Sequence, residues 1–158
     1  APVTGRLDIG QYAFWFGLIT YILLLIVVCK RVFLVGEIPA PAQPTTVIFA
    51  APASLLLAGY MVSFPEKNSL IVYALLACSI FFWVVGMLYL FKTFSFVFIP
   101  SHSAFTFPLV ISALAVKLSA GFTQLSWQGI LYEIQTVIAL VVVLWALIRY
   151  VMFLFAKD

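Results

Sequence analysis

Charged residues are scarce in this chain. Asp, Glu, Lys and Arg together make up 8% of its 158 residues, whereas 66% of the residues are hydrophobic. A soluble domain carries about 25% charged residues, which cover the surface that faces water. A chain so poor in charge cannot present such a surface. We therefore expect an integral membrane protein.

Cysteine and the common catalytic motifs are also rare or absent. The two cysteines, Cys29 and Cys78, lie in separate apolar runs and belong to no CxxC or Cys/His spacing, so we expect neither a disulfide framework nor a metal site. The sequence contains no phosphate-binding loop, paired carboxylates or Ser/His/Asp arrangement. We expect no enzyme activity, no cofactor and no nucleic-acid partner.

Five long apolar runs occupy most of the chain, and each is close to the roughly 20 residues that cross a bilayer as a helix. They cover residues 10–29, 45–64, 69–91, 101–122 and 128–155. The links around 65–68 and 123–127 are short, so the helices on either side of each should be antiparallel neighbours. The sequence predicts an all-α integral membrane protein in which residues 1–158 form a single transmembrane domain.

Basic residues predict the orientation of these spans. If the spans alternate in direction, one side of the membrane receives most of the Lys and Arg residues that flank them: Lys30, Arg31, Lys92, Arg149 and Lys157. The other side receives Arg6 and Lys67. Because loops rich in Lys and Arg stay in the cytoplasm, the C-terminus is expected to be cytoplasmic.

Two of the five runs contain an internal proline. Pro52 lies in "FAAPASLLLAGY" and Pro108 in "FTFPLVISALA". An interior proline removes one backbone hydrogen bond and kinks the helix. Small residues follow both prolines, and the other three runs are richer in large aliphatic residues. We interpret the proline runs as kinked inner helices and the other runs as plain outer helices, although proline also occurs in membrane helices for packing alone.

The order "GQYAFWFGLITYILLL", "PTTVIFAAPASLLLAGY" and "FTFPLVISALA" resembles the tellurite-resistance/dicarboxylate transporter family, which includes the plant slow-type anion channels. The resemblance extends over the whole chain, and its most specific element is the aromatic-Phe-Pro sequence of the fourth run. It implies ten transmembrane helices in hairpins around a central pore, a homotrimer in the cell inner membrane, and conduction of small inorganic anions.

The resemblance also places the five runs as the last five of the ten helices. The second and fourth runs would line the pore, and Phe107 would be the phenylalanine that occludes it. Because two of five pore-lining helices cannot enclose a pore, we expect this chain to be the C-terminal half of such a channel, or to be completed by another polypeptide.

An uncharged ring in a narrow conduit blocks ions because it fills the lumen and cannot replace their hydration shell. We therefore predict that Phe107 is the gate, oriented by the bend at Pro108. Phe105 is the second candidate, although its spacing directs it to another side of the helix. The apolar stripe expected on the Phe107 face, which could line the pore or simply pack, consists of Val110, Ile111, Leu114 and Leu118. The alternative is that Phe107 packs between helices.

Lys117 is the only basic residue deep within the fourth run, and Glu133 lies at a similar depth in the fifth. Ionisable groups inside a membrane are functional candidates. An ion pair between Lys117 and Glu133 is the preferred interpretation. A pore-facing Lys117 that attracts anions, and a Lys117 that extends to the interface, are the alternatives.

Three functions are therefore compatible with the sequence. The first is a passive anion channel. The second is a coupled transporter of dicarboxylates or of tellurium oxyanions, for which Lys117, Glu133 and His102 are the only titratable groups within the spans that could take part. The third is a structural membrane subunit without a conduit.

Overall fold

The computed structural model describes residues 6–34, 51–93 and 100–155, and these residues form helices, with short turns between the second and third and between the last two. In chain order the elements are α1 (Leu7–Leu34), α2 (Ala51–Ser63), α3 (Ser69–Thr93), a 3-10 helix η3 (Pro100–Phe105), α4 (Thr106–Thr123) and α5 (Ser126–Phe155). The described part of the chain contains no strand. The prediction of an all-helical protein is confirmed.

Four of these helices are long and apolar enough to cross a membrane: α1, α3, the segment of η3 and α4, and α5. Their bounds agree closely with four of the predicted runs. The described part of the second run is the 13-residue α2, and its predicted residues 45–50 lie outside the described residues. The composition and length of the four helices support a membrane protein.

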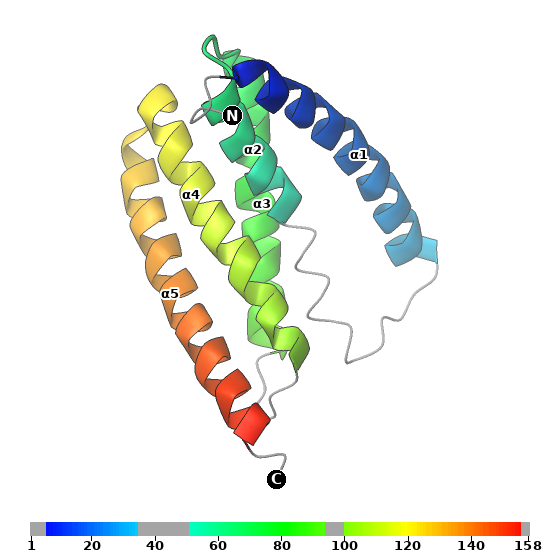
Figure 1. The fold of residues 1–158 in the computed structure, drawn as a ribbon, viewed down its shortest axis with the longest axis vertical. Helices are drawn as coiled ribbons and strands as arrows, with labels where there is room; N and C mark the ends of the chain where they lie inside the picture. Colours follow the sequence, from blue (N-terminus) through cyan, green and yellow to red (C-terminus); the bar gives the residue numbers. More distant parts are fainter. Residues whose placement is uncertain (1–5, 35–50, 94–99, 156–158) are drawn as a thin grey trace.

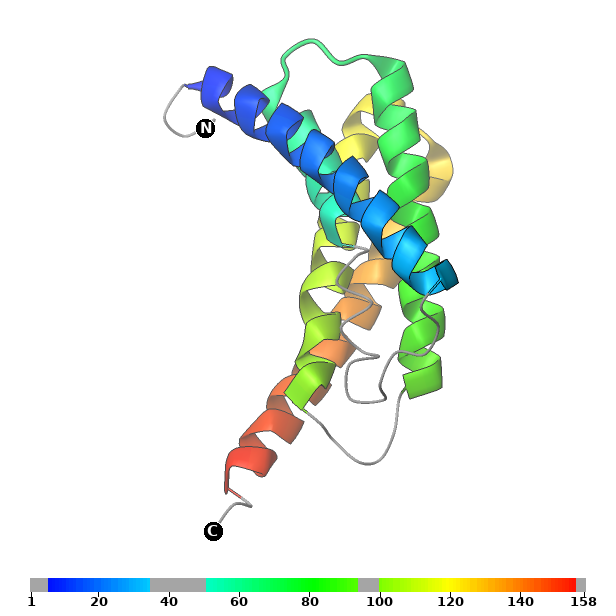
Figure 2. The same cartoon turned by 90° about the vertical axis from the view of Figure 1, so that its right-hand side faces the viewer.

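The helices are arranged as two antiparallel hairpins with a tilted fifth helix beside them (Figure 1). One hairpin consists of α2 and α3 and the other of α4 and α5, as the short links predict. Helix α2 lies at the centre, in contact with α1, α3 and α4. Helix α1 packs against α2 near one end and diverges from the bundle toward the other end (Figure 1), and it crosses the bundle at an angle (Figure 2).

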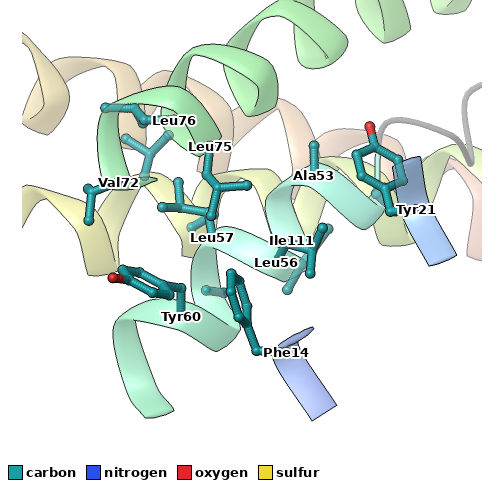
Figure 3. Close-up of a cluster of buried hydrophobic side chains, with 14 residues drawn as sticks. Phe14, Tyr21, Ala53, Leu56, Leu57, Tyr60, Val72, Leu75, Leu76 and Ile111 are labelled. Carbon is teal, nitrogen blue, oxygen red and sulfur yellow. The ribbon is translucent and has the colours of Figure 1, made fainter. Parts of the chain in front are cut away.

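The larger apolar core surrounds α2 (Figure 3). Leu57 of α2 and Val72 of α3 are fully buried there, and Phe14 of α1 packs against the ring of Tyr60 with 5.0 Å between ring centroids. Ile111 of α4 belongs to the same cluster. A second, smaller cluster joins α3, η3, α4 and α5; its members are Leu90, Phe105, Leu109, Ala139 and Val142.

Polar residues begin and end the helices at the turns. Asn68 caps α3, because its Oδ1 accepts the backbone N–H of Leu70 at 2.9 Å. The backbone N–H of Asn68 donates to the Tyr60 hydroxyl at 3.0 Å, which ties the turn back to α2. Gln124 ends α4 in the left-handed conformation, with φ of 51°, so the chain reverses within two residues and α5 packs directly against α4.

Candidate pore-facing surface of α4

Helix α4 exposes one narrow stripe. From Phe107 to Lys117 its exposed side chains are spaced by three, four and three residues, which places them on one face of a helix; Gly121 and Phe122 are exposed near its C-terminal end. This stripe, called here the α4 stripe, consists of Phe107, Val110, Leu114 and Lys117. The first three side chains are 55%, 48% and 44% exposed, and Lys117 is exposed as well.

The remaining faces of α4 are buried by its neighbours. Half of its candidate span is buried within the bundle, a larger share than for α1, α3 or α5. Phe107 therefore lies on an open side of the most buried of these four spans. This is the side on which further helices or lipid would contact α4.

The four apolar residues predicted on the Phe107 face divide between the two alternatives, lining a pore or packing. Ile111 is buried in the core around α2 and Leu118 is half-buried against it, whereas Val110 and Leu114 are exposed. The reason is the side on which α2 packs. Helix α2 contacts α4 along the face that carries Ile111 and Ala115, and the sequence alone does not specify that face.

Phe105 and Phe107 face different sides of the chain, as their spacing predicts. Phe105 is fully buried in the smaller core. His102 stacks on the Phe105 ring with 6.3 Å between ring centroids and lies edge-on to Trp145 at 5.7 Å. His102 is itself buried, so it belongs to an aromatic cluster at the base of α4. Phe105 lies away from the stripe.

Pro108 lies close to the start of α4, and Pro52 lies next to residues 35–50, which are outside the described part of the chain. Pro108 is the third residue of α4 and directly follows the transition from η3, and Pro52 is the second residue of α2 as described. The first four N–H groups of an α-helix have no partner within it, so proline in this turn removes no hydrogen bond of α4. Pro108 therefore lies in the first turn of α4, and the bends predicted at Pro108 and Pro52 both stay predictions.

Lys117 lies next to an aromatic ring on α5. Its ammonium nitrogen is 5.1 Å from the centroid of Tyr132, which is the geometry of a cation–π contact. Glu133 is the next residue on α5 and is exposed. The ion pair found in the described part of the chain joins Arg6 to Asp8, so the preferred Lys117–Glu133 pair is not formed and Tyr132 is the neighbour of Lys117.

A groove of about 640 Å³ is lined by residues of α1 and α2. Residues with small side chains leave space along the groove: Gly10, Ala13 and Gly17 on α1, and Gly59 on α2. Leu55 of α2 also lines the groove and is 51% exposed. The spacing of the small residues on α1, three and four positions apart, is the sequence signal that indicates this groove.

Charge is almost absent from the two proline-containing helices. Neither α2 nor α4 contains an acidic residue, and Lys117 is the only charged residue in either helix. An acidic side chain along a conduit would attract cations and repel anions. The open side of α4 therefore combines an apolar ring, two apolar side chains and one cation.

No family model, no curated protein and no solved structure matches the chain.

Proposed function

We propose that this chain forms part of a passive anion channel of the cell inner membrane, with Phe107 as the side chain that occludes the conduit. The proposal rests on the resemblance in the "FTFPLVISALA" segment. The observation that carries it is the exposure of Phe107 on the open side of α4, the most buried of the four long apolar spans. A ring in this position is free to contact a permeating ion.

Pro108 supports the position of the ring. The proline is buried, its ring restricts φ, and it follows directly on the gate residue in the first turn of α4. The backbone that carries Phe107 is therefore held by buried neighbours on both sides, Phe105 and Pro108. In this proposal, the exposed phenylalanine obstructs the conduit by filling it and by excluding the water that an anion requires.

Lys117 supplies the attraction for anions. It lies ten residues beyond Phe107, which is about 15 Å along an α-helix, on the same stripe. Its contact with Tyr132 keeps the ammonium group beside α5, and no acidic residue of α2 or α4 opposes it. An anion would meet this cation at one end of α4 and the obstructing ring at the other.

Two helices cannot enclose a conduit. In this proposal, helices beyond this chain cover the exposed side of α4. The chain is then the C-terminal half of a ten-helix protomer, and the protomers form a homotrimer. The cytoplasmic position of the C-terminus belongs to the same proposal and follows from the distribution of basic residues.

Anion currents across planar bilayers test the proposal. With the intact protein in its native assembly, Phe107→Ala should raise the anion conductance several-fold because the obstruction is removed. The control is Phe81→Ala, because Phe81 is a 62% exposed phenylalanine on the outer helix α3, and its removal should leave the current unchanged. Equal currents in the wild type and in Phe107→Ala would refute the gate. A saturating, proton-dependent flux would indicate the coupled transporter, and no flux from folded protein would indicate a structural subunit.

A further inference from the structure

A cluster of three polar side chains joins α4 to α5 next to their turn. Gln128 of α5 is fully buried, and its Nε2 donates to the Ser119 hydroxyl oxygen at 3.3 Å. Its Oε1 accepts a hydrogen bond from the Thr123 hydroxyl. Both polar atoms of this buried amide are therefore satisfied by side chains of α4.

The same residue types recur seven positions farther from the turn on each helix. Ser112 precedes Ser119 by seven residues, and Gln135 follows Gln128 by seven. Seven residues are about two helical turns, and α4 and α5 run antiparallel (Figure 1). Ser112 and Gln135 therefore lie at equivalent positions along the same interface, and they are 1% and 0% exposed.

The second site differs from the first in its hydrogen bonds. The Ser112 hydroxyl and both the Nε2 and Oε1 atoms of Gln135 have no hydrogen-bond partner in the described part of the chain. The position that corresponds to Thr123 is occupied by Val116, which is fully buried and carries no donor. If the Nε2 atom of Gln135 donated to Ser112 directly, the Oε1 atom of Gln135 would still have no side-chain donor, because Val116 replaces the threonine.

Unsatisfied polar atoms are costly inside a membrane protein, because hydrocarbon offers no alternative partner. Buried groups of this kind are usually satisfied by an ordered water, which makes about three hydrogen bonds. We infer that Ser112 and Gln135 together bind one water molecule at the α4–α5 interface. The water accepts from Gln135 Nε2, donates one hydrogen to Gln135 Oε1 and donates the other to Ser112.

The surroundings restrict the occupant to a small neutral molecule. Ala115 and Ala139 lie one turn away on the two helices and are buried, so the adjoining walls are apolar and short. Ser112 and Gln135 carry no charge, and they offer the donors and acceptors that one water uses. This inference concerns an interface inside the bundle and does not depend on the proposed conduction.

A high-resolution experimental structure of the intact protein tests the site directly. We expect a density peak within hydrogen-bond distance of Ser112 Oγ and of both amide atoms of Gln135. The peak should disappear in Gln135→Met, which keeps the side-chain length without its polar atoms. A direct bond between the amide and Ser112 with no peak between them, or no density at the site, would overturn the inference.

Thermal unfolding of single and double variants gives a second, independent measurement. If one water links the two residues, Ser112→Ala should lower Tm in the wild type but have little effect in the Gln135→Met background. The matched control is the same cycle with Ser119→Ala and Gln128→Met. These two side chains are joined by a direct hydrogen bond, so their effects on Tm should be coupled without a bridging water. Additive losses for Ser112 and Gln135 would show that they share no bridging molecule.

Discussion

Phe107 and Pro108 are neighbours in the chain, yet Phe107 is 55% exposed while Pro108 is buried. Helix α4 begins at Thr106, one residue before Phe107, where η3 ends. Consecutive residues of a helix point in directions about 100° apart, so burial of the proline against the bundle directs the phenylalanine to the open side. This relationship connects the local backbone to the exposed stripe that the proposed channel requires.

Phe105 and Phe107 should respond differently to the same truncation. Phe105 is fully buried in the smaller core, so Phe105→Ala should destabilise the protein by about 3 kcal/mol, the usual cost of removing a buried ring. Phe107→Ala removes a largely exposed ring and should change stability little. Thermal unfolding in detergent would measure both. Equal losses from the two variants would show that Phe107 is packed in the intact protein.

Lys117 should be energetically coupled to Tyr132 and independent of Glu133. The ammonium lies 5.1 Å from the Tyr132 ring centroid, and an exposed cation–π contact contributes about 0.5 kcal/mol. Double-mutant cycles of Lys117→Met with Tyr132→Leu, and of Lys117→Met with Glu133→Gln, would measure the two couplings. A larger coupling to Glu133 would restore the ion pair that the sequence suggested.

The helices themselves were predictable from the sequence because a helix that crosses a membrane needs a long run of apolar residues. The predicted runs 69–91 and 128–155 correspond to α3 (Ser69–Thr93) and α5 (Ser126–Phe155). The short turns correctly predicted both antiparallel hairpins. The different directions of Phe105 and Phe107 also followed from helix geometry alone.

The rotation of each helix about its axis was not predictable, because almost every face of these helices is apolar. Ile111 was expected either to line a pore or to pack, and it is buried against α2. Lys117 was expected to pair with Glu133, but the preceding residue, Tyr132, faces it. In both cases an adjacent helix decides which residue is covered, and the hydrophobic pattern does not distinguish the alternatives.

A buried pair of serines should hold α2 against α3. The Ser54 and Ser79 hydroxyl oxygens lie 2.7 Å apart, and both residues are buried. Replacing either serine by alanine leaves one hydroxyl without this partner, so each single variant should be less stable than the wild type. Interhelical hydrogen bonds in membrane proteins contribute about 0.6 kcal/mol, and a cycle of Ser54→Ala with Ser79→Ala should show a coupling of that size. Additive single losses would contradict the bond.

The turn between α2 and α3 should depend on the side chain of Asn68. Its Oδ1 accepts the backbone N–H of Leu70 at the start of α3, and loss of such a cap costs about 1 kcal/mol. Asn68→Ala should therefore lower the midpoint of thermal unfolding. Asn68→Asp should keep the midpoint close to that of the wild type, because a carboxylate accepts the same hydrogen bond and interacts favourably with the N-terminal end of the helix dipole. The backbone N–H of residue 68 still reaches the Tyr60 hydroxyl in both variants, so their comparison isolates the cap. Equal unfolding midpoints for the two variants would show that the side chain of residue 68 does not stabilise α3.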